Sequence, residues 1–136
     1  MRRPFLLGLL SLPLLAGCAM PGGEAPQAPV HVVFFTEDSA ALDEAAQAVV
    51  ADAARKAQAD ANLPVRVMGF ADPDGGRAYN RALSAARAER VAEALREQGV
   101  PASRISVAPR GPVPFEMMPL ESRRVEIVLG APAPAR

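Results

Sequence analysis

The stretch from Gly69 to Ala88 constrains the fold of this chain more than any other part of its sequence. Residues 65–68, just before it, are Val-Arg-Val-Met, an alternation with a period of two that predicts a strand. Residues 72–76, Asp-Pro-Asp-Gly-Gly, predict a loop. A helix is expected from Asn80 to Gln98, because the apolar residues after the loop recur at helical spacing. The chain is therefore expected to pass from a strand through a tight loop into a helix.

One arginine lies where this helix should bury its apolar side chains. On a helical wheel, Arg87 falls between the apolar residues Leu83 and Val91. A guanidinium cannot be neutralised, so an arginine on a core-facing stripe needs an anionic or carbonyl partner nearby. The nearest candidate carboxylates are those of Asp72 and Asp74, in the loop that precedes the same helix.

The first residues of the chain look like a bacterial lipoprotein signal. Arg2 and Arg3 precede an apolar run that is too short to span a bilayer as a stable helix. The run ends in Leu15-Ala16-Gly17-Cys18, which resembles a lipobox. We predict a signal peptide at residues 1–17 and acylation of Cys18, with an ordinary secretory leader as the alternative.

The residues after the signal predict an anchored domain. Cys18 is the only cysteine, so the chain has no intramolecular disulfide. Ala19 stands where Asp would resemble an inner-membrane retention signal, which favours the outer membrane. Residues 18–29 are rich in Pro and Gly and predict an acylated tether to a periplasmic domain.

The remaining elements complete the expected domain at residues 30–129. Asp38 or Ser39 can cap a first helix. The strand before it is apolar on both faces, which favours a central or covered position. Residues 130–136 predict a disordered tail. Three strands are expected besides the one at residues 65–68, at residues 30–35, 105–109 and 123–129.

This order of elements predicts the fold class. The sequence βαβαββ favours a two-layer α/β sandwich, with the helices on one face of a four-stranded mixed sheet. The chain has 136 residues, enough for one such domain with extensions. Its formal net charge is zero and it has no cluster of basic residues, so we expect no nucleic-acid partner.

The spacing of the central motif resembles the signature of the OmpA-like domain, the peptidoglycan-binding module of OmpA C-terminal regions and of Pal lipoproteins. The matching positions are Gly69, Asp72, Gly75, Tyr79-Asn80, Leu83-Ser84 and Arg87-Ala88. Residues 123–127, Arg-Arg-Val-Glu-Ile, are similar to the end of that domain. Three positions depart from the family: Glu37 replaces a Phe, Phe70 a frequent His, and Ser122 an Asn, which weakens a side-chain contact expected there.

The resemblance implies a ligand and its binding residues. In the family, the positions of Asp72 and Arg87 hold the diaminopimelate of the peptidoglycan stem peptide, with Arg on its carboxylate and Asp on its ammonium. The alternative is an internal Asp–Arg pair that only joins loop to helix. Asn80 and Tyr79 are expected to orient the loop or touch ligand, with helix capping as a further role for Asn80, whereas Phe70 is expected to line the groove or the core. The candidate ligand-binding residues are Asp72, Arg87, Asn80, Phe70 and Leu83.

Other chemistries lack the residues they need. Residues 72–76 lack the further carboxylates and the closing Glu of a calcium loop, so we expect no metal and no cofactor. His31 is the only histidine and is expected in a strand, far from any nucleophile, so no catalytic pairing is predicted. We therefore expect no enzyme. Two hypotheses remain: an outer-membrane lipoprotein that ties the membrane to peptidoglycan, and a scaffold subunit of an envelope complex that does not bind the wall.

Overall fold

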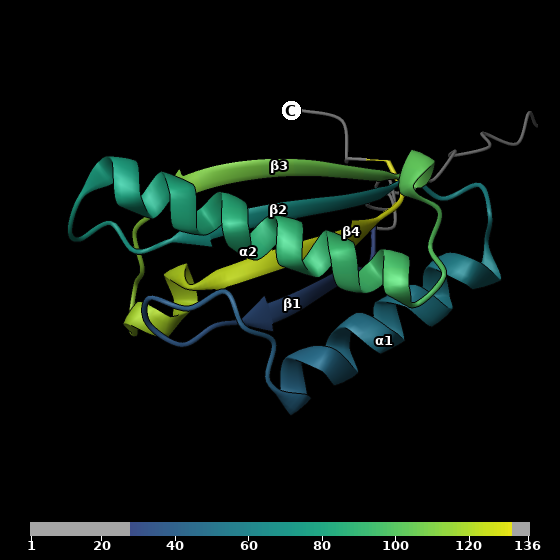
Figure 1. Cartoon of the computed structure of the whole chain (residues 1–136), viewed down its shortest axis with the longest axis horizontal. Coiled ribbons are helices and arrows are strands. Elements are labelled where there is room, and N and C mark those ends of the chain that lie inside the picture. Colours follow the sequence, from purple (N-terminus) through teal and green to yellow (C-terminus); the bar gives the residue numbers. More distant parts are fainter. Residues whose placement is uncertain (1–27, 132–136) are drawn as a thin grey trace, which may run out of the picture.

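The computed structural model describes residues 28–131, in which two helices cover one face of a four-stranded sheet (Figure 1). Two short 3-10 helices, at Ala102–Arg104 and Pro119–Ser122, complete the structure. The order confirms the predicted βαβαββ sandwich. The elements are β1 Val30–Phe34, α1 Glu44–Ala59, β2 Val65–Ala71, α2 Arg77–Glu97, β3 Ile105–Pro112 and β4 Arg124–Leu129.

Several predictions concern residues outside this range. The signal peptide, Cys18, most of the tether and residues 132–136 of the tail lie outside the described residues. Within residues 28–131, neither helix has the length and apolar character that crossing a bilayer requires.

The sheet is mixed, as expected, but its first strand does not lie where the sequence predicts. The strand order is β1-β4-β2-β3, with β2 parallel to β3 and β4 antiparallel to both of its neighbours. The prediction of a central or covered β1 is therefore wrong. Its Val33 faces the helices and is buried, whereas Val30 and Phe34 are 52% and 48% exposed on the helix-free face. An edge strand can leave one of its faces exposed even when that face is apolar. The apolar residues on both faces of β1 therefore do not show where this strand lies in the sheet.

The first helix begins later than either predicted cap. Asp43 is the N-cap of α1, and its side chain accepts a hydrogen bond of 2.8 Å from the backbone N–H of Ala46. The predicted caps, Asp38 and Ser39, instead belong to a loop between β1 and α1. Asp38 has a left-handed backbone with φ of 52°, a conformation that does not start a helix. This loop forms one wall of the site described below.

The second helix starts directly after Gly76 and ends just before Gly99. Gly76 is the N-cap of α2, so the helix begins before the predicted Asn80. At the other end Gly99 has a φ of 95°, and the N–H of Val100 returns to the carbonyl of Leu95 at 3.0 Å. The predicted stop at Gly99 is confirmed. The earlier start places Asn80 in the first turn of α2, close to the loop that follows β2.

Candidate functional site

A groove opens at the carboxyl end of β2, the end of a strand at which α/β sheets form their crevices. It has a volume of about 370 Å³. Three segments form its walls: the loop between β1 and α1, the loop between β2 and α2, and the segment before β4. Its lining residues are Glu37, Asp38, Asp72, Asp74, Gly75, Tyr79, Asn80, Phe115, Pro119 and Arg123.

Asp72 lies in this groove, and its cationic partner comes from a distant part of the chain. Its Oδ2 accepts a hydrogen bond of 2.8 Å from Nε of Arg123, which is 51 residues away in sequence. The two side chains are 21% and 18% exposed, so both are partly accessible from the groove. The buried hydroxyl of Ser122 donates to Oδ1 of the same carboxylate. The contact that we expected to be weakened at Ser122 is therefore present, as a hydrogen bond from serine to Asp72.

Arg87 is buried as its place on the apolar stripe predicts, but its partners are carbonyl groups. It is 1% exposed, and its guanidinium donates to the carbonyl oxygens of Ser39 at 2.8 Å, Thr36 at 3.0 Å and Phe70 at 3.3 Å. Burial lowers the pKa of Arg87 and the nearby charge of Asp72 raises it. The group stays protonated at neutral pH, because a guanidinium does not lose its proton in proteins. Asp72 acts on it through space, while Arg123 holds the direct ion pair.

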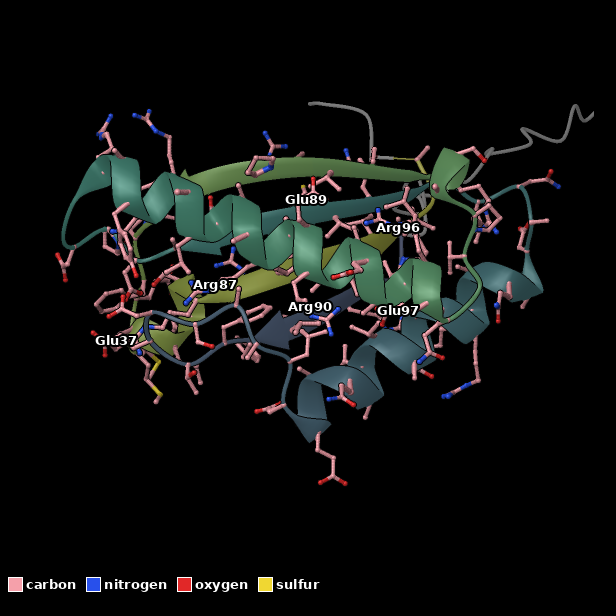
Figure 2. All side chains as sticks on the ribbon, viewed as in Figure 1. Glu37, Arg87, Glu89, Arg90, Arg96 and Glu97 are labelled. Atoms are coloured by element: carbon pink, nitrogen blue, oxygen red, sulfur yellow. The ribbon has the colours of Figure 1, made fainter. Side chains whose placement is uncertain are left out.

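These contacts make Arg87 a clamp behind the groove. Thr36 and Ser39 flank the two residues of the β1–α1 loop that line the groove, Glu37 and Asp38. Figure 2 shows Arg87 beneath α2, on the side of the β1–α1 loop where Glu37 lies. Arg87 therefore fixes the backbone of one wall.

Asn80 does the same for the opposite wall. Its side-chain amide donates to the carbonyl oxygens of Asp72 at 3.0 Å and Asp74 at 2.6 Å. Asn80 is 5% exposed, and no cap is formed by its side chain because the helix already begins at Gly76. Of the roles left open by the sequence, these contacts support that of orienting the loop, and Asn80 also lines the groove.

The other two candidate residues lie outside the groove lining. Phe70 alternates along β2 with Gly69 and Ala71, which face α2, so its ring lies on the helix-free face of the sheet. There the guanidinium of Arg124 stacks over the ring at 4.2 Å from its centroid. Leu83 is half-buried on α2. The expectation that Phe70 lines the groove or the core is wrong, because the strand alternation turns its ring to the opposite face.

Sequence reasoning missed the groove residues contributed by the segment before β4, which are Phe115, Pro119 and Arg123. Arg123 directly precedes β4, and its place in the alternation is the same as that of the buried Val125 and Ile127, so it needs an anionic or carbonyl partner. Tyr79, in the first turn of α2, donates from its hydroxyl to the carboxylate of Asp38 at 3.3 Å and so joins α2 to the β1–α1 loop across the groove. Within residues 28–131, no three His, Cys, Asp or Glu side chains gather as they would around a metal ion.

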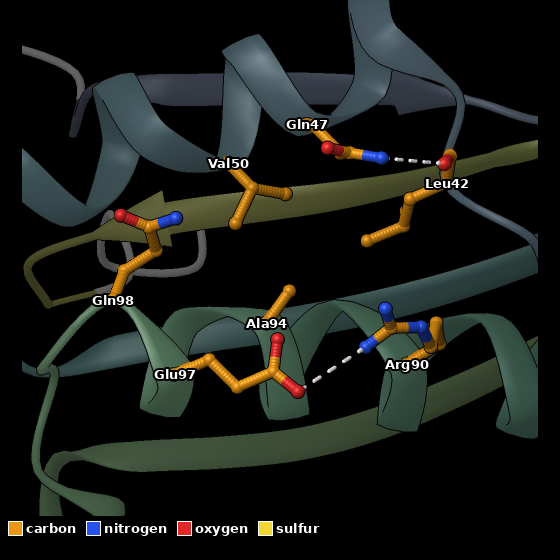
Figure 3. Close-up of a pocket in the computed structure, with 7 residues that line it drawn as sticks. All are labelled: Leu42, Gln47, Val50, Arg90, Ala94, Glu97 and Gln98. Atoms are coloured by element: carbon orange, nitrogen blue, oxygen red, sulfur yellow. Dashed lines mark hydrogen bonds and ion pairs between the residues drawn. The ribbon is translucent and has the colours of Figure 1, made fainter.

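A second hollow lies between the two helices and shares no lining residue with the groove (Figure 3). It has a volume of about 150 Å³. Three of its polar side chains have partners within the molecule: Nε2 of Gln47 donates to the carbonyl of Leu42 at 3.1 Å, and Nη1 of Arg90 lies 3.9 Å from Oε1 of Glu97. We therefore place the candidate site in the groove at β2.

Comparison with known proteins agrees with this architecture. A sequence model of the OmpA family matches residues 34–114. The chain belongs to the OmpA family. This OmpA-family chain is 37% identical over 99 residues to a peptidoglycan-associated lipoprotein of Agrobacterium fabrum, covering 71% of the chain and 55% of the relative. It is 39% identical over 82 residues to outer membrane protein 40 of Porphyromonas gingivalis, covering 60% of the chain and 21% of that protein.

The solved structures extend the comparison to the fold. The crystal structure of the peptidoglycan-associated lipoprotein from Burkholderia pseudomallei is similar with a TM-score of 0.67 and 26% identity. The match covers 73% of this chain and 89% of that one. The OmpA-family chain spans about half the length of the lipoprotein from Agrobacterium fabrum and about a fifth of the protein from Porphyromonas gingivalis. The resemblance to the OmpA-like domain predicted from the sequence is confirmed.

Proposed function

We propose that this OmpA-family protein binds peptidoglycan non-covalently, without catalysis, through the groove at the end of β2. The observation that carries the proposal is the pair of opposite charges in the groove, Asp72 and Arg123. Oδ2 of Asp72 lies 2.8 Å from Nε of Arg123, and both side chains are partly accessible. The free end of diaminopimelate in a stem peptide carries an ammonium and a carboxylate on one carbon atom. A carboxylate beside a guanidinium is complementary to such a zwitterion.

The proposal assigns the predicted site residues to two roles. Asp72 accepts hydrogen bonds from the ligand ammonium, and Arg123 uses its remaining donors on the ligand carboxylate. Arg87 and Asn80 position the two walls, since each donates to backbone carbonyl groups of a wall segment. The exposed ring of Tyr79 offers an apolar surface to the methylene chain of diaminopimelate.

We further propose that the domain is held at the outer membrane by lipid on Cys18. The lipobox supports this anchor, and the relatives' names, peptidoglycan-associated lipoprotein and outer membrane protein 40, agree with an envelope location. Residues 18–29 reach about 40 Å when fully extended, at roughly 3.3 Å per residue. Such a tether lets one protein link the membrane to the cell wall.

Co-sedimentation with purified sacculi tests the binding proposal. Asp72→Asn removes the charge that receives the ligand ammonium, so binding should weaken by about 30-fold or more, the loss expected for truncating one member of a desolvated charge pair. Tyr79→Ala, at an exposed position, should weaken binding less and leave the fold intact. Glu89→Gln, on the exposed face of α2, is the control and should sediment like the parent. Circular dichroism on the same samples verifies folding. If the parent protein stays in the supernatant, or folded Asp72→Asn sediments equally well, the proposal is wrong.

The anchor has its own test. Cys18→Ser should leave the precursor unprocessed and move the protein out of the detergent phase in a phase-partition experiment, because no acyl chain is attached. A substituted protein that partitions and migrates like the parent would show that Cys18 is not the anchor.

A scaffold role in an envelope complex is the second candidate. The helix-free face of the sheet and the segment before β4 expose large apolar side chains, which are typical of protein interfaces. These are Val30, Phe34, Met117, Met118 and Leu120. This role predicts a lipidated, folded protein that does not sediment with sacculi.

A further inference from the structure

We propose that the groove prefers a stem peptide whose diaminopimelate is amidated, so that its free end bears a net positive charge, over the form with a zwitterionic free end, and that Glu37 sets this preference. The inference rests on the proposed function and names the chemical form of its ligand. It concerns a residue that departs from the pattern the chain otherwise resembles, in which a Phe stands at this position.

The first support is the balance of charge in the groove. Four of its lining residues carry carboxylates, and Arg123 is the one cation among them. The charge of Arg87 lies behind the wall, where the guanidinium is bonded to three carbonyl oxygens. The groove therefore has a negative potential, which attracts a cation more strongly than a zwitterion. The carboxylates belong to Glu37, Asp38, Asp72 and Asp74.

The second support is the environment of Arg123. Its Nε lies 2.8 Å from Asp72, and its Nη2 lies 3.5 Å from Oε2 of Glu37. A ligand carboxylate approaching Arg123 would meet the like charge of Glu37. A carboxamide has no charge to be repelled, and its oxygen can accept from Arg123 while its NH₂ group donates to Glu37. The pair of Arg123 and Glu37 thus offers one donor and one acceptor to an amide.

The third support is that the position of Glu37 is fixed although its side chain is exposed. The side chain is 71% exposed at the rim of the groove. On either side of it the backbone is held, because the carbonyl groups of Thr36 and Ser39 both accept from Arg87. The left-handed backbone of Asp38 turns the loop directly after it. Glu37 is therefore presented to the ligand by a constrained loop, and its substitution should not disturb the fold.

Binding of two soluble muropeptides tests the inference. They are identical disaccharide tripeptides except that one carries free diaminopimelate and the other its carboxamide. The parent protein should bind the amidated peptide about two- to five-fold more tightly by calorimetry, the size expected of one partly exposed charge interaction. Glu37→Gln should abolish or reverse the preference, and added salt should reduce it in the parent. Glu89→Gln makes the same charge change on α2 and should keep the parent's ratio.

The outcomes separate this inference from the function on which it rests. If the parent binds both peptides with equal affinity, or the free form more tightly, peptidoglycan binding stands and the preference is refuted. If Glu37→Gln keeps the parent's ratio, Glu37 does not set it. If the parent binds neither peptide, the proposed function and this inference fail together.

Discussion

Replacing Gly69 by Ala should lower the free energy of unfolding by about 3 kcal/mol or more, the upper range for overpacking a close contact. Gly69 lies in β2 directly under α2. A methyl group there would overlap the carbonyl oxygen of Ser84 and lie 3.0 Å from Cβ of Ala88. Backbone cannot yield as a flexible side chain does, so α2 must move away from the sheet. Thermal unfolding should show a loss of about 12 °C or more for a domain of this size.

A second glycine gives the matched control. Gly76 has an ordinary φ of −71°, and an added Cβ would find its nearest neighbour, Cβ of Tyr79, at 3.7 Å. Gly76→Ala should therefore change stability by less than about 1 kcal/mol, the scale of an exposed N-cap substitution. If both variants melt together near the parent, α2 does not depend on close approach at Gly69.

Arg87→Ala should be the other severe substitution, costing about 3–5 kcal/mol of folding stability, as for groups in a broken buried polar network. It leaves the carbonyls of Thr36, Ser39 and Phe70 without their donor and opens a cavity in the core. Arg87→Lys keeps the charge but lacks the planar fork that reaches three acceptors, so it should recover only part of the loss. The measurement is urea unfolding followed by circular dichroism.

Arg96→Ala is the control for Arg87, because Arg96 is an exposed arginine near the end of the same helix. It should stay within about 0.5 kcal/mol of the parent, as surface substitutions usually do. An Arg87→Ala protein as stable as Arg96→Ala would show that Arg87 does not hold the β1–α1 loop in place. Because Arg87 is buried, water in the groove cannot solvate the groups that its removal leaves unpaired, so the variant should lose stability in full. A loss of sacculus binding by Arg87→Ala must therefore be compared with its loss of stability.

Local pattern was enough to predict the elements and the burial of Arg87. Strand alternation at residues 65–68 and helical spacing after Asn80 report which face of each element is apolar, and packing follows that face. Gly99 ended α2 as expected because a left-handed residue there stops a helix. These features depend on residues close together in the sequence.

What could not be predicted depends on long-range pairing. The partner of Asp72 is Arg123, because β4 inserts between β1 and β2 and brings its first residues to the end of β2. The same insertion leaves β1 at the edge. The late start of α1 has a similar cause, since Arg87 takes the carbonyls of the preceding loop. Asp72 is close to Arg87 in the sequence and was therefore an expected partner. The strand order instead places Arg123 beside Asp72.

The most direct test of the central claim is a titration of the ¹⁵N-labelled protein with a diaminopimelate muropeptide, followed by amide chemical shifts. We expect the largest shifts at residues 37–38, 72–79 and 123, the segments that form the groove. Amides of the helix-free face, such as Phe34, and of the hollow between the helices, such as Ala94, should stay unchanged. Shifts confined to either of those surfaces, with the groove unaffected, would contradict the account.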